Sequence, residues 1–462
     1  MKPILLIDFG STYTKVTSVD VQSEKILGTA ESFTTASSDI SQGLEAAVRI
    51  LEQKTGKIEY EYKFACSSAA GGLKMVTIGL VPDLTAEAAR RAALSAGAKV
   101  AGVFSFELDQ EELDEIQVIK PDIVLLTGGT DGGNKSTILH NAEKLSVVEG
   151  DFAIVVAGNK SVASKVRDIL LSSGKEVRVC QNVMPEFGKL NIEPARDAIR
   201  DLFLQRIIKA KGLTKVQQLI EGILMPTPLA VLKAVHVLST GYHNEDGLGD
   251  ILAVDVGGAT TDVYSICDGK PTRAGVVMKG LPEPFAKRTV EGDLGVRYGS
   301  ASLTEVVGIE TIAGISGLSV EDTRCCLDEI NANPGLLPGN NEKLARLDFG
   351  LSSLAIKEAV NRHAGYIQEI YTPMGLLYTQ TGKDLTDVRT VIGTGGVIIN
   401  SKRPLEIMKN VLYDPDTPEI LKPVNADIYI DAGYILAAMG ILSERYPEIA
   451  VRIIKRELEM IS

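Results

Sequence analysis

The chain has 462 residues, of which 45% are hydrophobic and 23% charged, as expected for a globular protein of two or three domains. Its net charge is −12 and it has no dense cluster of lysine and arginine, so we expect no nucleic-acid partner. The longest apolar runs, such as residues 123–126 and 153–157, are too short to span a bilayer, and residues 1–3 lead into a predicted strand without a signal peptide. We therefore expect a cytoplasmic protein with no membrane partner.

Cysteine and histidine give little support for a metal centre. An odd number of cysteines without a Cys-x-x-Cys spacing is typical of reduced thiols. The adjacent Cys325 and Cys326 are compatible with a redox pair or a shared iron–sulfur cluster, but two neighbouring thiols on a helix is the favoured interpretation. The four histidines are scattered along the chain, so no histidine-based metal site is predicted.

The first predicted strand ends in a pattern that suits phosphate. The apolar residues 3–7 are followed by Asp8, Gly10 and a run of hydroxyl residues at 11–14. Glycine lets a ligand approach the backbone, N–H groups and hydroxyls can bind phosphate oxygens, and a carboxylate can hold hydrated Mg²⁺. A plain β-turn is the alternative interpretation of this stretch when it is taken alone.

The first half continues as alternating strands and helices. We predict a strand meander and then a parallel α/β pattern. The predicted strands are 17–21, 25–29, 62–66, 100–108, 123–126, 152–157 and 176–179; the predicted helices are 41–54, 84–98, 109–119, 161–172, 194–211 and 229–239. Two loops of small residues, 67–73 and 128–133, are candidate ligand loops, with tight packing between layers as the alternative.

The second half repeats the pattern of the first. Residues 251–263 have the same order of apolar strand, acid, glycine and small or hydroxyl residues, and Asp255 follows Asp8 by 247 positions. We therefore predict two domains, residues 1–240 and 241–462. Further predicted strands are 262–267, 272–278 and 388–392, and further predicted helices are 320–330, 341–347, 353–371, 431–440 and 447–460. The glycine turns at 127–130 and 393–396 are predicted to be equivalent turns of the two halves.

Taken in order, these motifs resemble those of the actin-like ATPase superfamily, which includes sugar kinases, heat-shock chaperones and actin. Residues 8–15 resemble its first phosphate motif, 255–262 its second and 393–396 its adenosine motif, while 228–239 and 431–440 fall where the family has two connecting helices. The resemblance implies an α/β fold of the ribonuclease H-like type, in which two duplicated mixed-sheet halves flank a cleft for ATP and Mg²⁺.

The resemblance also assigns roles to individual residues. Asp8 and Asp255 would hold Mg²⁺, mostly through water, and Asp131 is a candidate for positioning the attacking water, with an Asx-turn as the alternative. Lys15 would reach a phosphate or form a salt bridge. The remaining residues implied to bind phosphates are Gly10, Ser11, Thr12, Thr14, Gly257, Gly258, Ala259 and Thr260, and those implied to admit the adenosine are Gly393, Thr394, Gly395 and Gly396.

A narrower resemblance covers the full length. Residues 8–15, 66–73, 125–134 and 253–262 look like those of the MutL/GlmL family, which is distinct from the DNA mismatch-repair protein of the same letters. That family accompanies adenosylcobalamin-dependent glutamate mutase and ornithine or lysine aminomutases in amino-acid fermentation. The resemblance implies an ATP-driven reactivating chaperone that helps to release damaged cobalamin, acting on mutase subunits as a homodimer or with a second reactivase subunit.

Other functions remain open at this point. A small-molecule kinase of the same fold, acting on a sugar or carboxylic acid, needs a catalytic base beside the substrate hydroxyl. Asp122 at a strand start and Asp131 in a glycine loop are weak candidates for that base. A dehydratase activator needs spaced cysteine ligands for a shared cluster, which Cys325 and Cys326 do not supply. A cytoskeletal polymer is the fourth alternative, and no feature favours it.

Overall fold

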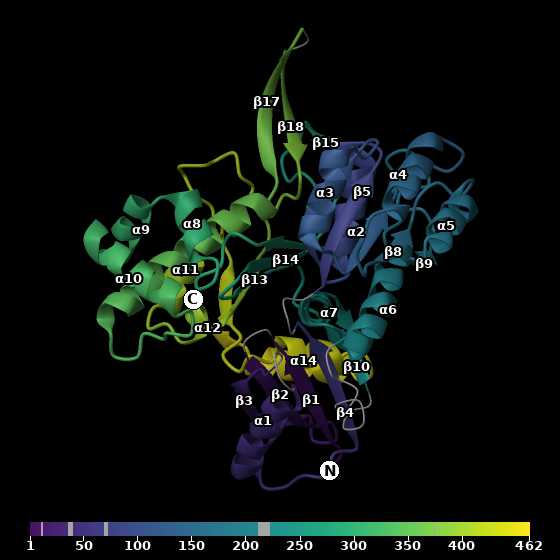
Figure 1. The fold of residues 1–462 in the computed structure, drawn as a ribbon. Helices are drawn as coiled ribbons and strands as arrows, with labels where there is room; N and C mark the ends of the chain where they lie inside the picture. Colours follow the sequence, from purple (N-terminus) through teal and green to yellow (C-terminus); the bar gives the residue numbers. More distant parts are fainter. Residues whose placement is uncertain (11–12, 36–39, 69–72, 211–221, 374) are drawn as a thin grey trace. The chain divides into compact units, whose positions relative to one another are not determined.

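The computed structural model describes residues 1–10, 13–35, 40–68, 73–210, 222–373 and 375–462 (Figure 1). The chain divides into two compact units. The first unit comprises Met1–Ala234, Gly280–Pro282 and Ala437–Ala450, and the second comprises Val235–Lys279, Glu283–Leu436 and Val451–Ser462. None of the helices described by the structure is long and apolar enough to cross a membrane.

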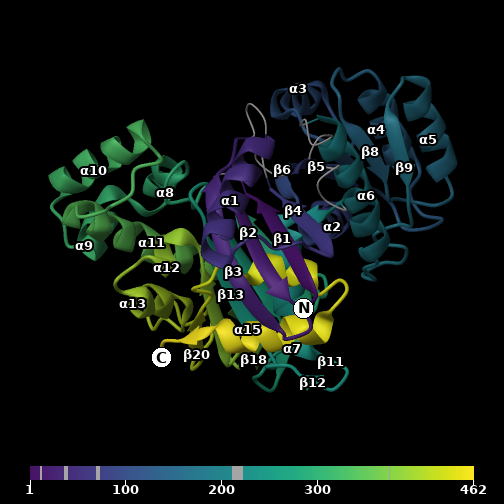
Figure 2. The ribbon, with the colours of Figure 1, turned by 90° about the horizontal axis from the view of Figure 1, so that it is seen from below.

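The first unit contains a mixed sheet of five strands in the order β3-β2-β1-β4-β10. β2 is antiparallel to both β1 and β3, whereas β4 is parallel to β1 and β10 is parallel to β4. Helix α1 packs on β2 and β3 (Figure 2). It contributes Leu44, Ala47 and Leu51 to the core. The elements are β1 (Pro3–Phe9), β2 (Tyr13–Asp20), β3 (Lys25–Phe33), α1 (Ile40–Thr55), β4 (Tyr62–Ser67) and β10 (Gly222–Pro226).

The second unit contains a mixed sheet in the equivalent order, β16-β14-β13-β19-β20, extended by the short strand β21. β14 is antiparallel to β13 and β16, and β19 and β20 are parallel to β13. This identity of order and direction confirms the duplicated mixed α/β fold. The strands are β13 (Ile251–Val256), β14 (Thr261–Ile266), β16 (Ala286–Glu291), β19 (Thr390–Thr394), β20 (Asp427–Ile430) and β21 (Glu459–Met460).

A second sheet of the first unit is inserted in the chain between β4 and β10. Its five strands are all parallel and lie in the order β6-β5-β7-β8-β9, with helices on both faces. Such a doubly covered sheet needs strands that are apolar throughout, which is why residues 123–126 and 153–156 are fully buried. The strands are β5 (Lys74–Gly79), β6 (Lys99–Ser105), β7 (Ile123–Leu126), β8 (Ala153–Val156) and β9 (Glu176–Val179).

The helices of this insertion divide between two cores. Alternate residues of each strand point to opposite faces, so Leu125 joins one core and Leu126 the other. Helices α2 (Glu87–Ser95) and α6 (Glu193–Ala210) cover the first face; α3 (Gln110–Ile119), α4 (Ser136–Ser146) and α5 (Ala163–Ser172) cover the second. A turn of π-helix, Pro82–Ala86, precedes α2. Strand β5 was not predicted from the sequence.

The predicted equivalence of the two glycine turns is wrong. The turn at residues 127–130 follows β7 in the inserted parallel sheet, whereas the turn at 393–396 follows β19 in the mixed sheet. The counterpart of β19 in the first unit is β4, because both lie next to the first strand and parallel to it. Part of the loop after β4, residues 69–72, lies outside the described residues.

Two predictions in the second half are corrected by strand pairing. The third strand of its mixed sheet is β16, not residues 272–278; β15 (Val276–Lys279) instead belongs to a three-stranded sheet with β17 (Tyr366–Thr372) and β18 (Gly375–Thr381). The predicted helices 341–347 and 353–371 form one helix, α11 (Glu342–His363), and the rest of that stretch is β17. The helix ends before Gly365, where a side chain would lie 2.7 Å from the Gly382 backbone.

The remaining elements surround the second mixed sheet or connect the units. The chain passes from the first unit to the second inside α7 (Thr227–Thr240), and returns at the start of α14 (Leu436–Leu442). Within the first unit these helices touch so closely that a side chain at Gly440 would overlap the Ala230 carbonyl. The other elements are β11 (Gly241–Tyr242), β12 (Glu245–Asp246), α8 (Ser300–Val307), α9 (Ile309–Ser316), α10 (Val320–Ala332), α12 (Gly396–Ile399), α13 (Pro404–Met408), a 3-10 turn at Lys409–Val411 and α15 (Pro447–Glu457).

Candidate functional site

A tight turn joins the first two strands of the first mixed sheet. The Gly10 N–H donates to the Tyr13 carbonyl oxygen at 3.0 Å and closes the turn. A Cβ on Gly10 would lie 2.5 Å from that same oxygen, so the turn requires glycine. The Thr34 hydroxyl donates to the Gly10 carbonyl at 2.8 Å and lies 3.1 Å from the Thr14 hydroxyl. The other two predicted phosphate-binding residues of this turn, Ser11 and Thr12, lie outside the described residues.

The second mixed sheet carries the same turn. The Gly257 N–H donates to the Thr260 carbonyl oxygen at 2.9 Å, and a Cβ on Gly257 would lie 2.9 Å from that oxygen. In each hairpin the acid stands two residues before the turn glycine, Asp8 in one and Asp255 in the other. Each acid also sits at the same register, with its partner on the neighbouring strand seven positions later. The structure thus builds one turn twice.

The Asp8 carboxylate is held by two residues from distant parts of the chain. The Thr227 hydroxyl donates to Asp8 Oδ1 at 2.5 Å, and the Cys66 thiol donates to the same oxygen at 3.4 Å. Burial raises the pKa of Asp8 above its ordinary value, while the charge of Lys15 and the hydrogen bonds from Thr227 and Cys66 act in the opposite direction. The site therefore combines a desolvated carboxylate with donors that favour its ionised form.

Opposite charges occupy one equivalent position of the two hairpins. Lys15 pairs with Asp8 across the first hairpin, whereas Asp262 pairs with Asp255 across the second. Asp262 is engaged by a buried arginine, with Arg288 Nε 2.8 Å from Asp262 Oδ1. The two functions predicted for Lys15, a phosphate ligand or a salt bridge, both remain predictions.

The second turn is backed by the segment that precedes α8. The Val296 N–H donates to the Gly257 carbonyl at 3.2 Å, and the Arg297 N–H donates to the Gly258 carbonyl at 2.8 Å. The Arg297 guanidinium forms two hydrogen bonds, of 2.8 and 2.7 Å, with the Asp348 carboxylate on α11. Because both side chains of this pair are almost fully buried, the turn is fixed to the long helix behind it.

The predicted adenosine motif is a close backbone crossing in the second unit. Gly395 has φ +109°, and a Cβ there would lie 2.4 Å from the Val256 carbonyl oxygen, at the end of β13. The preceding Thr394 donates its hydroxyl to Asp431 Oδ2 at 3.3 Å. Asp431 in turn accepts the backbone N–H groups of Ile435 and Leu436 and so caps α14. The motif therefore brings the end of β19 against the phosphate hairpin.

The other residues of the motif differ in how tightly they are packed. A side chain at Gly393 would lie 2.6 Å from the sulfur of Met408, whereas one at Gly396 would lie 3.6 Å from the Tyr434 hydroxyl. Among the glycines of this turn, Gly393 and Gly395 are therefore the two whose surroundings leave no space for a side chain. A Cβ at Gly396 would make only an ordinary van der Waals contact with the Tyr434 hydroxyl.

Asp131 lies in the loop after β7, in the inserted parallel sheet. Its Oδ1 accepts hydrogen bonds from the Lys160 backbone N–H and the Asn182 side chain, each at 3.0 Å. Partial burial raises the pKa of Asp131, but these hydrogen bonds and the Lys160 charge outweigh it, and the net shift is downward. The contacts describe a carboxylate that holds its own loop together, and its predicted role toward an attacking water stays a prediction.

Each turn carries one carboxylate, Asp8 in the first unit and Asp255 in the second. Carboxylate oxygens are ligands that Mg²⁺ prefers, and Mg²⁺ usually keeps several waters and binds through one or two carboxylates. Within the described part of the chain, no group of three or more histidine, cysteine or acidic residues is arranged to hold a metal ion. The adjacent Cys325 and Cys326 lie on α10, one exposed and the other buried.

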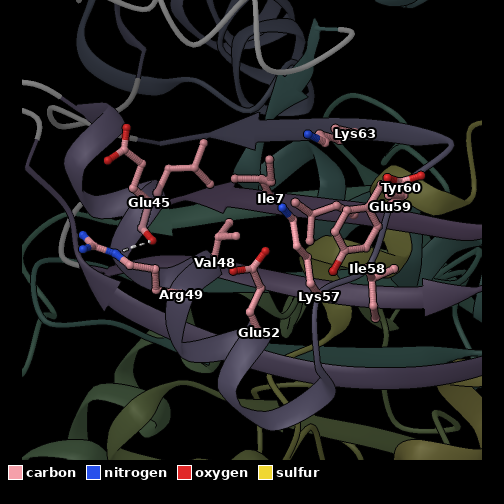
Figure 3. A pocket seen from close by; sticks show the side chains of 12 residues that line it. Ile7, Glu45, Val48, Arg49, Glu52, Lys57, Ile58, Glu59, Tyr60 and Lys63 are labelled. Carbon is pink, nitrogen blue, oxygen red and sulfur yellow. Dashed lines mark hydrogen bonds between the residues drawn. The ribbon is translucent and has the colours of Figure 1, made fainter.

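A surface pocket of about 650 Å³ lies on the face of the first mixed sheet that α1 covers (Figure 3). Leu5 and Ile7 of β1 line it together with Val48 of α1, and charged side chains of both signs surround it. Successive residues of a strand point to opposite faces, so Asp8 points away from the face on which Ile7 lines this pocket. The pocket is therefore separate from the phosphate-type turn.

Several residues of the site were not predicted from the sequence. Thr227 stands next to the predicted connecting helix 228–239 and Cys66 begins the stretch 66–73 of the family resemblance, but neither pattern places these residues beside Asp8. Arg297 and Asp348 had no signal, because 51 residues separate the two partners. These residues act through contacts between distant segments, which local patterns do not reveal.

The chain matches known proteins over nearly its full length. The family model described as MutL protein matches residues 4–458. Protein MutL from Clostridium tetanomorphum is 50% identical over 460 residues, covering 99% of each chain. The chain belongs to the MutL family. This membership confirms the resemblance inferred from the four sequence stretches.

Solved structures resemble the MutL-family chain only weakly as whole molecules. Xylulose kinase from Lactobacillus acidophilus is 13% identical, with a TM-score of 0.36 over 100% of this chain and 93% of that one. The activator of 2-hydroxyisocaproyl-CoA dehydratase from Clostridium difficile is 12% identical, with a TM-score of 0.31 over 100% of this chain and 99% of that one. Structural similarity at this level does not indicate a function for the chain.

Proposed function

We propose that this protein is a slow Mg²⁺-dependent ATPase that reactivates an adenosylcobalamin-dependent mutase or aminomutase. The observation that supports it best is the acid-bearing turn built twice, once in each mixed sheet, with Asp8 and Asp255 at the same register. A single turn of this kind has many uses. Two copies with matched acids suit a ligand that carries several phosphates and a divalent cation.

The residues of the turns have distinct roles in this proposal. Backbone N–H groups around Gly10 and Gly257 bind phosphate oxygens in this proposal. Glycine lets the phosphate come close to the backbone, and this matters more here than the chemistry of a side chain. Asp8 and Asp255 hold Mg²⁺ largely through its waters; when bound, Mg²⁺ neutralises charge on the phosphates. The adenosine binds beside Gly396, where a Cβ would lie at an ordinary contact distance of 3.6 Å from the Tyr434 hydroxyl.

The client is inferred from the family. Radical mutases lose activity when their cobalamin is damaged, and we propose that hydrolysis of ATP drives the conformational change that releases the damaged cofactor. Glutamate mutase and the ornithine or lysine aminomutases are the candidate clients. The protein acts in the cytoplasm in this proposal, as a homodimer or with a second small subunit.

Restoration of a blocked mutase tests the proposal. Glutamate mutase, ornithine aminomutase and lysine aminomutase are each inactivated with cyanocobalamin and then given adenosylcobalamin, the purified protein, Mg²⁺ and ATP. We expect turnover to recover for one of them with ATP and not with a non-hydrolysable analogue. If none recovers, the chaperone function is wrong. Fast phosphoryl transfer to a sugar, an amino acid or another carboxylic acid in a parallel screen would establish a kinase instead.

A further inference from the structure

We propose that Thr227 is a positioning residue that fixes the orientation of the Asp8 carboxylate and leaves one of its oxygens for the hydrated metal ion. The inference rests on the proposed ATPase function and adds to it a residue outside every motif of the sequence. Thr227 touches neither phosphate nor metal in this proposal; it acts through Asp8.

Both donors to the carboxylate converge on the same oxygen. The Thr227 hydroxyl lies 2.5 Å from Asp8 Oδ1, the Cys66 sulfur lies 3.4 Å from it, and Thr227 Oγ1 and Cys66 Sγ are themselves 3.6 Å apart. Among the residues that the structure describes, Asp8 Oδ2 accepts no hydrogen bond. Rotation of the carboxylate would break both bonds, so the pair of donors selects which oxygen remains available for a ligand.

The hydroxyl is carried by a rigid backbone. Thr227 is the first residue of α7 and stands between Pro226 and Pro228, which restrict the backbone on both sides. Behind it, a side chain at Gly97 would lie 3.0 Å from Pro226 and 3.2 Å from the Leu229 backbone nitrogen, so the inserted sheet packs directly on this helix start. A donor held in this way orients its acceptor at little entropic cost.

The second unit shows that the fold does not impose this contact. There Thr394 pairs with Asp255 as Cys66 pairs with Asp8, and Asp431 directly follows the fifth strand as Thr227 does. Asp431 is an acid where the first unit has Thr227. Its carboxylate accepts a hydrogen bond from the Thr394 hydroxyl and caps α14. The residue that follows the fifth strand therefore donates to the turn acid in the first unit and caps a helix in the second.

A valine substitution tests the inference, because valine keeps the shape of threonine and removes the hydroxyl. ATP affinity is measured by calorimetry with and without Mg²⁺, and metal affinity by electron paramagnetic resonance of Mn²⁺ in the presence of ADP. For Thr227→Val we expect a loss of about 10- to 100-fold in Mn²⁺ affinity and in the Mg²⁺-dependent gain in ATP affinity. We expect metal-free ATP to bind as in the wild type, and Thr227→Ser to restore metal affinity to within a few-fold.

Two further variants separate positioning from folding. Thr323 is a buried threonine of α10 whose hydroxyl bonds the Ser319 carbonyl, so Thr323→Val serves as a matched control that changes the melting temperature and not metal affinity. Cys66→Ala removes the weaker donor and should lower Mn²⁺ affinity less than Thr227→Val does. This variant also keeps the test decisive if Thr227→Val does not fold, because unchanged Mn²⁺ affinity in Cys66→Ala would then contradict the shared-oxygen arrangement.

The outcomes distinguish this inference from the function on which it rests. Wild-type metal affinity in a folded Thr227→Val protein overturns the positioning role and leaves the ATPase proposal intact. Equal loss in the valine and serine variants also overturns it, because serine retains the donor. A wild-type protein that binds no ATP overturns the proposed function and this inference together.

Discussion

The two phosphate-type turns share one backbone and differ in what supports it. In the first turn side chains supply the support, since Thr227 and Cys66 donate to Asp8 and Thr34 donates to the Gly10 carbonyl. In the second turn backbone N–H groups supply it, since those of Val296 and Arg297 donate to the carbonyls of Gly257 and Gly258. In the proposed site the backbone N–H groups bind phosphate, which would require the same turn backbone in both hairpins and leave the contacts behind it free to differ.

This difference predicts separate consequences for the two turns. Changes behind the first turn should act on the metal through the orientation of a carboxylate. Changes behind the second should act on the phosphates and on stability, because its support is a buried ion pair on a long helix.

Removal of either acid should have the largest effect and should treat the two turns alike. We expect Asp8→Ala and Asp255→Ala each to lower Mg²⁺-dependent phosphate release by about 100-fold or more. Each variant lacks a carboxylate that holds the waters of the metal ion in the proposed site. Circular dichroism should show an intact fold in both variants. The exposed Asp168 of α5 provides a matched control, Asp168→Ala, with wild-type hydrolysis. Unchanged hydrolysis in both turn variants would reject the site.

Breaking the ion pair behind the second turn should have the next largest effect. Asp348→Ala leaves the buried Arg297 guanidinium without its partner, at a cost of about 3–5 kcal/mol in the free energy of unfolding. Urea unfolding measures this cost, and calorimetry should show weaker binding of metal-free ATP. The double variant Arg297→Met with Asp348→Leu should lose much less stability. A single variant as stable as the wild type would show that the pair does not support the turn.

Features that depend on residues close together in the sequence could be predicted, whereas contacts between distant segments could not. The strand, acid and glycine at residues 3–10 and 251–257 form a local pattern, so both turns and the duplicated sheets were predictable. The Thr227–Asp8 bond spans 219 positions and leaves no local trace. The parallel pattern of the inserted sheet was predicted, but its glycine turn at residues 127–130 was wrongly equated with the turn at 393–396, since a glycine turn after a buried strand looks the same in a parallel and in a mixed sheet.

The three-stranded sheet escaped prediction for a different reason. Residues 366–372 follow a long amphipathic helix and contain apolar residues at spacings that also suit a helix, so the period alone extends α11 too far. What decides the structure is the pairing of β17 with β18, which forms only after the chain reverses. Short apolar stretches of this kind take their conformation from their partners.

The crossing of Gly395 on the second hairpin should respond to a single methyl group. Gly395→Ala forces φ +109° on a residue with a side chain and places its Cβ 2.4 Å from the Val256 carbonyl, so we expect a loss of about 1–3 kcal/mol and weaker nucleotide binding. The neighbouring Gly396 is a matched control, because a Cβ there meets only the Tyr434 hydroxyl at 3.6 Å. Equal melting temperatures for the two alanine variants would contradict the crossing.

The smallest effect is a pH dependence that belongs to the second mixed sheet. His363 on α11 is fully buried, with Nε2 2.8 Å from the Ser265 hydroxyl and Nδ1 2.8 Å from the Thr289 hydroxyl. Burial, aided by the charges of Lys287 and Lys383, lowers its pKa well below the ordinary value of 6.5. The folded protein therefore keeps this ring neutral below pH 6.5 while the unfolded chain binds a proton.

Stability should accordingly fall as the pH drops below the unfolded pKa of His363, by about 1.4 kcal/mol per pH unit from this residue alone, until the folded pKa is reached. Carboxylates with lowered pKa values add to the loss in acid, so the contribution of His363 is the difference between the wild type and His363→Gln. Urea unfolding of both proteins at pH 7.5, 6.5 and 5.5, about one unit apart, measures that difference. The glutamine variant should lose less stability between the two lower pH values. Parallel curves would mean that the ring binds a proton in the folded protein as readily as in the unfolded chain. Both ring nitrogens would then donate to the hydroxyl oxygens of Thr289 and Ser265.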